Sequence, residues 1–316
     1  MTTSLVRQWL DAGELNLPLP ASGDTVGRWL KLAEFTEVDV VAGRLAEAHT
    51  DAVAILAELG GPSAQPGQLW GVWAAEAPGQ RLTAGHDGDA VALGGVKPWC
   101  SGAGLCSHAL VTAHGVDGNR ELFAVDLAQP GVTPLASSWR NAGMATSDTR
   151  SVSFDDAPAM PIGAPGDYLA RPGFWHGAIG VAACWLGGAR AVAAPLYERA
   201  ASGCAGDHTL AHLGAVDAAF AAAEATLAAA ADHIDADPGN RSGLAELIAR
   251  RVRAVVESAV EEALARTDRA LGPGPLCLDE RHARAVADLT VYVRQSHAER
   301  DLAALGLLTA TSRDHR

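Results

Sequence analysis

The chain has 316 residues, of which 48% are hydrophobic and 19% charged, and its mean hydropathy is +0.08. These values exclude a disordered chain, and the length is too great for one core, so we expect two or three structural units. With 24 Lys and Arg against 37 Asp and Glu, the formal charge of −13 would repel nucleic acid and anionic lipid. We therefore expect neither nucleic acid nor a membrane as a partner.

Three other sequence features bear on the cellular location. The five cysteines form no Cys-x-x-Cys motif, which favours neither a disulfide framework nor a clustered zinc site and fits a reducing compartment. Residues 1–10 contain no continuous hydrophobic run of the signal-peptide type. The apolar stretch 177–196 is interrupted by Arg190 and Pro195, so we expect a buried packing helix there. The sequence predicts a cytoplasmic protein.

The first segment, residues 1–66, is predicted to be a shortened helical domain. Apolar residues of the stretch 38–59 recur with the spacing of an amphipathic helix, and Gly60 follows its end. A preceding helix is predicted from about Asp24, whose side chain can cap it, to Phe35.

The second segment, residues 67–157, has a different texture of short runs rich in Val and Trp, divided by Gly, Asp and Asn. The sequence Gly115-Val116-Asp117-Gly118-Asn119 lies between two of these runs and is a hairpin signal. We predict a central antiparallel β domain in which four tryptophans supply buried area. The predicted strands cover residues 69–75, 90–96, 109–114, 122–125 and 151–154.

The third segment, residues 158–316, begins with a linker rich in Pro and Gly and then becomes rich in alanine. Its apolar residues follow helical spacing in four successive stretches. Alanine lets helix axes approach closely, which suits a tight four-helix bundle. The four stretches cover residues 174–201, 210–234, 244–271 and 279–305.

The common phosphate-binding and hydrolase motifs are missing, namely GxGxxG before a helix, GxxxxGK[ST], HExxH and GxSxG. The most distinctive string is Gly-Gly-Val-Lys-Pro-Trp-Cys-Ser-Gly-Ala at residues 94–103. A flat redox ring needs an apolar plate, a hydrogen-bond donor at its reactive nitrogen and closely approaching backbone. Trp99, Ser101 and Gly102 could supply these three features. Taken alone, however, the string is explained more simply by a core tryptophan followed by an ordinary turn.

Further motifs follow in order along the chain. They are Gly143-Met144-Ala145-Thr146 before Ser153-Phe154-Asp155-Asp156, then Leu271-Gly272-Pro273-Gly274, and finally Arg300-Asp301. Together with Lys97-x-Trp99-x-Ser101, their order resembles that of the acyl-CoA dehydrogenase superfamily of FAD-dependent enzymes. The resemblance covers nearly the whole chain. It implies an α+β fold, with a short helical N-terminal unit, a central antiparallel β domain and a C-terminal four-helix bundle, and FAD extended between the β domain and the bundle.

The resemblance also implies roles for individual residues at the cofactor. Trp99 and Ser101 would lie beside the flavin ring, with the Ser101 hydroxyl near its N5. Ala75 stands where the family has a threonine that meets the pyrimidine side of the ring, so one hydrogen bond is lost or replaced. Gly272 and Gly274 match the family's glycine-rich turn.

Two other family motifs are absent. The loop 78–81 has no counterpart of the Gly-Ser that usually contacts phosphate and thioester groups, and no Arg-x-x-Phe-Gly appears around residues 201–206. The resemblance implies a homodimer or tetramer in which one subunit completes another's cofactor site.

The family's usual catalytic base is also missing. It is a glutamate followed by glycine shortly after Arg-Asp, whereas here no carboxylate side chain follows Asp301 until Asp314. His297 is the predicted substitute, on the inner stripe of the last helix, with Asp301 one turn on to orient its imidazole. Histidines in a comparable position are typical of flavin monooxygenases that share this fold. The alternative is a structural histidine satisfied by Asp301 or by a backbone carbonyl.

Three functions follow from these observations. The first is an FAD-dependent oxidoreductase that dehydrogenates an acyl thioester or a related small-molecule acyl substrate, with a CoA thioester as the expected form. The second is a flavin-dependent monooxygenase on the same fold. The third is a catalytically silent subunit of a hetero-oligomer. Glu76, directly after a predicted strand, could face the cleft, but we expect a surface or salt-bridged role.

Overall fold

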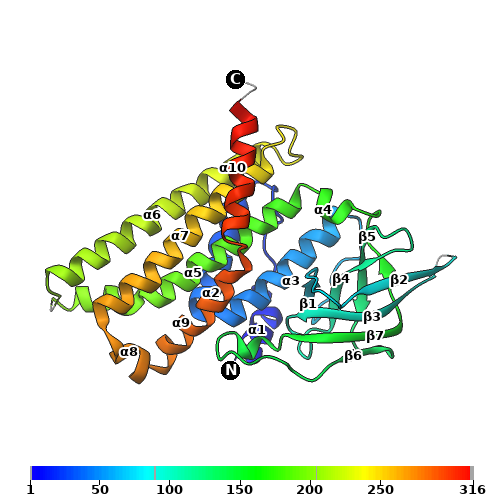
Figure 1. The fold of residues 1–316 in the computed structure, drawn as a ribbon, viewed down its shortest axis with the longest axis horizontal. Helices are drawn as coiled ribbons and strands as arrows, with labels where there is room; N and C mark the ends of the chain where they lie inside the picture. Colours follow the sequence, from blue (N-terminus) through cyan, green and yellow to red (C-terminus); the bar gives the residue numbers. More distant parts are fainter. Residues whose placement is uncertain (1, 89, 204, 314–316) are drawn as a thin grey trace. The chain divides into compact units, whose positions relative to one another are not determined.

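The computed structural model describes residues 2–88, 90–203 and 205–313 of the chain (Figure 1). Its contacts divide into two compact units. The first comprises Met1–Leu17, Leu45–Asn141 and Ala145–Phe174, and the second comprises Pro18–Arg44, Ala142–Met144 and Trp175–Arg316. Both units are discontinuous in sequence, and the three domains delimited by composition stay a prediction.

The first unit is built on an eight-stranded sheet. Its strand order is β6-β7-β3-β2-β4-β5-β8, and β1 pairs with β4. The pairs β1/β4 and β2/β4 are parallel and the others antiparallel. All five predicted strands are present, and the predicted turn at residues 115–119 joins β4 to β5. The strands are β1 (Trp70–Trp73), β2 (Leu82–Asp87), β3 (Ala90–Cys100), β4 (His108–His114), β5 (Arg120–Asp126), β6 (Val132–Pro134), β7 (Arg150–Pro158) and β8 (Met160–Pro161).

Two apolar clusters form the core of this unit. One lies among the strands and includes Trp73 and Phe123, and the other joins β1, β4 and β5 to the helix α3 through Ile55 and Trp70. Burying each large side chain contributes about 1.5–3 kcal/mol. Of the four tryptophans expected to supply buried area, Trp70 and Trp73 are buried, but Trp99 is 54% exposed and Trp139 only partly buried. The helical elements are α1 (Thr2–Asp11), α3 (Val40–Glu58, of which residues 40–44 belong to the second unit), η1 (Ala145–Ser147) and α4 (Asp167–Ala170).

The second unit contains the predicted long helices. Asp24 caps α2 as expected, because its carboxylate accepts a hydrogen bond from the Gly27 N–H at 3.2 Å. Helices α2 and α5 approach so closely at Gly187 that an added Cβ would lie 2.0 Å from the carbonyl oxygen of Ala33. The helices are α2 (Thr25–Val38), α5 (Gly173–Ala201), α6 (Asp207–Ala236), α7 (Ala245–Leu271), α8 (Pro273–Leu278), α9 (Glu280–Tyr292), η2 (Val293–Gln295) and α10 (Glu299–Arg313).

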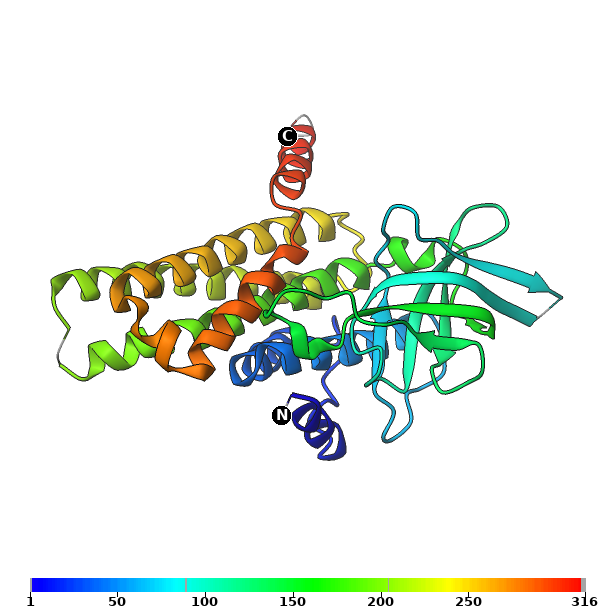
Figure 2. The same ribbon diagram turned by 60° about the horizontal axis from the view of Figure 1, so that its bottom comes forward.

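The last predicted helix is interrupted, which corrects the expectation of one helix over residues 279–305. Helix α9 ends at Tyr292, a short 3-10 turn follows, and α10 begins at Glu299. Ala298 has φ of 45°, which a right-handed helix does not permit. The Ser296 hydroxyl donates to Glu257 at 2.6 Å and accepts from the Ala298 N–H at 3.1 Å, which stabilises the break. Both views show α10 leaving the direction of α9 (Figure 2).

Helices α5 and α6 are long and apolar enough to cross a membrane by length and composition alone, and each contains an apolar stretch of 18 residues with a mean hydropathy of 1.4. In α5 that apolar stretch is 72% buried inside the structure, whereas in α6 it is 28% buried. The burial of α5 agrees with the packing helix predicted over residues 177–196. The helical content and the largely antiparallel sheet confirm the predicted fold class.

Candidate active site

The first component of the site is the end of strand β3. The register between β3 and β7 shifts between Lys97 and Cys100, and Trp99 within this irregularity has φ of 59°. Such a bulge re-aims a side chain, and here it exposes the indole of Trp99 while Cys100 stays buried. Trp99 packs edge-to-face against Trp139, with ring centroids 6.2 Å apart.

Ser101 directly follows this strand end and is held from two sides. Its carbonyl oxygen accepts a hydrogen bond from the indole N–H of Trp73 at 3.0 Å. Its hydroxyl lies 3.0 Å from the Thr149 hydroxyl, which lies 2.7 Å from the Ser147 hydroxyl. Three hydroxyl groups carry three protons but form only two bonds with one another, so one proton remains for another acceptor. When Ser147 donates to Thr149 and Thr149 to Ser101, that remaining proton is on Ser101.

The segment 147–149 that supports Ser101 was not identified from the sequence. Its backbone also binds the turn after β3, because the Gly102 N–H donates to the Ser147 carbonyl at 2.8 Å. The Asp148 carboxylate accepts from the Gly104 N–H at 2.8 Å. The run Ser147-Asp148-Thr149, shortly before the strand predicted from residue 151, could have indicated this segment. Side chains of these types commonly form hydrogen bonds to neighbouring backbone groups. Trp139 was likewise missed as the aromatic partner of Trp99.

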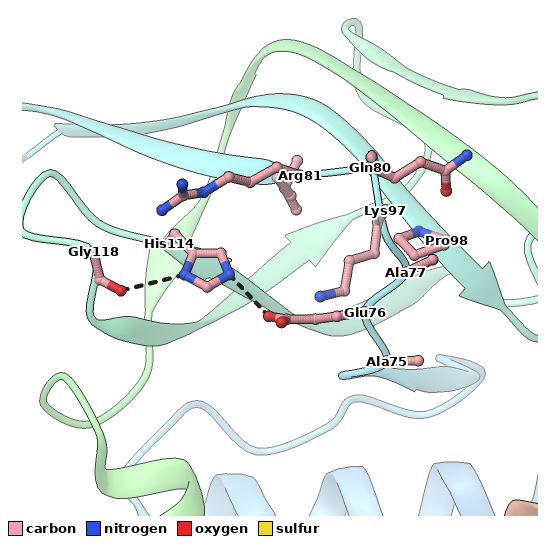
Figure 3. A pocket seen from close by; sticks show the side chains of 11 residues that line it. Ala75, Glu76, Ala77, Gln80, Arg81, Lys97, Pro98, His114 and Gly118 are labelled. Carbon is pink, nitrogen blue, oxygen red and sulfur yellow. Dashed lines mark hydrogen bonds and ion pairs between the residues drawn. The ribbon is translucent and has the colours of Figure 1, made fainter.

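Ala75 lies just beyond β1 and lines a pocket of about 540 Å³ in the first unit (Figure 3). Glu76 and Pro98 line the same pocket. The Glu76 carboxylate accepts from Arg120 at 2.8 Å and lies 2.9 Å from Nε2 of His114, which confirms the salt-bridged role. Slight burial raises the pKa of Glu76, but the charges and hydrogen bonds of Arg120 and His114 bring it below its ordinary value.

In the second unit, His297 lies in the break before α10 and not on an inner helical stripe. Its side chain is 66% exposed, and the predicted stripe is wrong because the helix does not continue through residues 293–298. Asp301 is its neighbour as predicted, with Oδ2 3.6 Å from Nδ1 of His297 and 3.1 Å from its backbone nitrogen. Partial burial raises the pKa of Asp301, but the His297 N–H and the charges of His297, Arg253 and Arg250 bring it below its ordinary value.

The two glycines predicted at the cofactor lie at the junction of α7 and α8. Gly272 has φ of 67° and ends α7, a conformation that favours glycine, while Gly274 lies within α8. A Cβ at either position would meet no atom within 4 Å. Their role in cofactor binding stays a prediction.

The Gly-Met motif has a clear structural explanation. The Met144 N–H donates to the buried carboxylate of Asp288 in α9. A Cβ on Gly143 would lie 2.1 Å from the carbonyl oxygen of Ala287. Glycine therefore lets this loop contact the backbone of α9 directly.

The residues at the end of β3 fit a flavin ring. Trp99 presents an exposed aromatic face, and the hydroxyl chain leaves a proton that Ser101 can donate to a ring nitrogen. Ala75 fits less well, because a methyl group supplies no hydrogen bond. Any contact there has to come from backbone groups.

Solved structures share this arrangement of elements. Butyryl-CoA dehydrogenase from Megasphaera elsdenii matches with a TM-score of 0.83 and 19% identity, covering 97% of this chain and 90% of that chain. The chain has the acyl-CoA dehydrogenase fold. Methanesulfinate monooxygenase MsuC from Pseudomonas fluorescens matches with a TM-score of 0.77 and 18% identity, covering 95% of this chain and 87% of that chain. TdsC from Paenibacillus, in complex with FMN and indole, matches with a TM-score of 0.76 and 18% identity, covering 100% of this chain and 96% of that chain.

These sequence identities establish a common fold and no more. No family model matches the sequence, and no curated protein matches it either. The neighbours with this fold include both a dehydrogenase and a monooxygenase, so the fold does not select one reaction.

Proposed function

We propose that the protein is a flavin-dependent oxidoreductase that removes two hydrogens from an acyl substrate such as a CoA thioester. The observation that carries this proposal is the Ser101 hydroxyl, which can donate a proton when Thr149 donates to it, two residues from the exposed indole of Trp99. FAD is the proposed cofactor, and FMN, which the TdsC structure holds, is the alternative. A cytoplasmic location and a homodimer or tetramer belong to the same proposal.

A bound flavin would supply two-electron redox chemistry. Trp99 would provide an apolar plate against one part of the ring, and Ser101 would donate a hydrogen bond to N5. The backbone around Ala75 would contact the pyrimidine side. Trp73 and Thr149 would hold Ser101 in place, because both bind it directly.

The proton removed from the substrate needs a base. His297 is the proposed base, since its imidazole is exposed and Asp301 lies beside it. The Asp301 carboxylate, kept ionised by its hydrogen bonds and nearby cations, would stabilise the imidazolium after proton transfer.

A flavin-dependent monooxygenase is the second candidate. It is favoured by the residues after Asp301, because α10 carries no carboxylate between residues 302 and 313, and Asp314 lies outside the described residues. In that case His297 would donate or hold a proton during oxygen chemistry instead of removing one from carbon.

The decisive experiment is anaerobic titration of the purified, flavin-loaded protein with a panel of acyl-CoA thioesters, followed by absorbance. Bleaching of the flavin by a thioester supports the dehydrogenase. Oxygen consumption that requires supplied reduced flavin, without bleaching by any thioester, selects the monooxygenase. Failure to bind FAD or FMN after saturation would overturn both and leave the silent subunit.

A further inference from the structure

Lysine is rare in this protein, and one of its two lysines is buried. The chain has Lys31 and Lys97 among 24 basic residues. Lys31 is on the surface, where it pairs with Glu34, whereas Lys97 in β3 is only 2% exposed. Burying an ammonium costs free energy unless it forms good hydrogen bonds or ion pairs. The presence of a buried lysine in a chain whose other basic residues are almost all arginine therefore needs an explanation.

The ammonium of Lys97 has neutral partners. It donates to the carbonyl oxygen of Thr112 at 2.7 Å and to the hydroxyl of Thr112 at 2.8 Å. An ammonium has three donors, and within the described residues no carboxylate lies within ion-pair distance of Lys97. Burial lowers the pKa of Lys97 to about 8, so the group is mostly charged at neutral pH.

Lys97 lines the pocket of about 540 Å³ that also contains Ala75, a volume suited to a small molecule. Four charged or titratable groups line it: Glu76 after β1, Arg81 before β2, Lys97 on β3 and His114 on β4. Arg120 on β5 adds an ion pair to Glu76. Figure 3 shows Lys97 directed toward Glu76 and His114, with Arg81 extended above them.

The only negative charge among these groups is already neutralised. Glu76 bonds to Arg120 at 2.8 Å and to His114 at 2.9 Å. The guanidinium of Arg81 has no hydrogen bond or ion pair to any other residue of the described chain. Lys97 and Arg81 therefore leave an excess of positive charge in this pocket, although the whole chain carries −13.

We propose that this pocket binds a small molecule through a carboxylate or phosphate group that Lys97 and Arg81 receive together. An oxyanion would take the remaining donor of the Lys97 ammonium and the fork of the Arg81 guanidinium. The oxyanion would also neutralise the buried ammonium of Lys97, which no carboxylate of the described chain contacts directly. The site uses groups that the proposed flavin chemistry leaves unassigned.

The scarcity of lysine makes a direct test possible. Protein labelled with ¹³C at the lysine Cε gives two NMR signals, and the K31R variant assigns them. Inorganic phosphate and acetate are titrated separately, with sodium chloride at matched ionic strength as the control. We expect at least one anion to move the Lys97 signal saturably and to raise its pKa, while the Lys31 signal follows sodium chloride alone.

The anion that acts identifies the chemistry of the ligand. A response to phosphate alone indicates a phosphate ester, a response to acetate alone a carboxylate, and a response to both supports the shared chemistry. The exposed Arg81 allows a variant that does not disturb the core, so R81Q is expected to weaken the affinity about tenfold and R81K to restore part of it. No response of Lys97 to either anion, or equal responses of both lysines, would overturn the proposal, as would full affinity in R81Q.

Discussion

The indole N–H of Trp73 donates a hydrogen bond to the carbonyl oxygen of Ser101, at 3.0 Å. Trp73 is a buried residue of β1, and Ser101 follows the end of β3, so this bond connects the sheet core to the candidate flavin contact. The same serine bonds through its hydroxyl to Thr149. The position of Ser101 therefore depends on two partners that are distant in sequence.

Replacing Trp73 with phenylalanine keeps an aromatic ring in the core and removes the donor to Ser101. We expect the free energy of unfolding to fall by about 1–3 kcal/mol and flavin affinity to weaken, because a partly buried carbonyl loses its partner. Urea unfolding and flavin titration measure the two effects. Trp70→Phe is the matched control, since the Trp70 indole bonds to Gln68 at 3.2 Å. Equal flavin affinity in the two variants would contradict the role of Trp73.

Replacing Ser101 with alanine removes the hydroxyl and leaves its carbonyl bond to Trp73. We expect a shifted flavin absorbance spectrum and reduction slowed about tenfold, the effect of one lost hydrogen bond to a group that gains charge. Ser101→Thr retains the hydroxyl and should recover most of both properties. An unchanged spectrum and rate in Ser101→Ala would remove this residue from the ring.

Replacing His297 with alanine tests proton transfer separately from cofactor binding. We expect turnover to fall about 10²–10⁴-fold with flavin content unchanged, because a general base is lost while the β3 edge is untouched. His208→Ala, at an exposed histidine of α6, is the control. Unchanged turnover would return His297 to a structural role.

The buried His49 predicts a loss of stability in acid. Its Nδ1 accepts a hydrogen bond from the Trp70 N–H at 3.2 Å, and burial lowers its pKa from 6.5 to about 4. Between these values the unfolded state binds the proton first, so the free energy of unfolding decreases as pH falls from 6.5 toward 4. The loss amounts to about 3 kcal/mol at most.

Urea unfolding across this pH range measures the slope. His49→Gln keeps an acceptor that does not titrate, and its stability should depend less on pH. His208→Gln should retain the wild-type slope, because that residue is exposed. The account of His49 fails if His49→Gln shows the wild-type slope.

The contact between Gly143 and α9 predicts an intolerant position. A Cβ there would lie 2.1 Å from the Ala287 carbonyl oxygen, so Gly143→Ala forces the loop or the helix to move. We expect a destabilisation of about 1–3 kcal/mol, measured by thermal or urea unfolding. Gly239→Ala is the control, because nothing lies within 4 Å of its added Cβ. Equal free energies of unfolding in the two variants would contradict this prediction, because they would show that the loop moves without destabilising the fold.

The sequence by itself determined the features that depend on local spacing. The amphipathic period of residues 38–59, the cap at Asp24 and the turn at residues 115–119 each act over a few residues, and each is present in the structure. The order of the motifs along the chain also indicated the fold, through the family resemblance that this order carries. Strands β2, β6 and β8 escaped prediction, since their short runs depend on partners across the sheet.

Tertiary structure alone decided where the chemically important groups lie. The break in the last helix is stabilised by the hydrogen bond from Ser296 to Glu257 on α7, a contact across 39 positions that no local period reveals. The bulge that exposes Trp99 and the hydroxyl chain at Ser101 arise from pairing with β7 and from the segment just before it. The positive pocket combines Lys97 of β3 and His114 of β4 with Arg81, which lies just before β2. Long-range packing fixes such groups in space, and burial then lowers the pKa of Lys97.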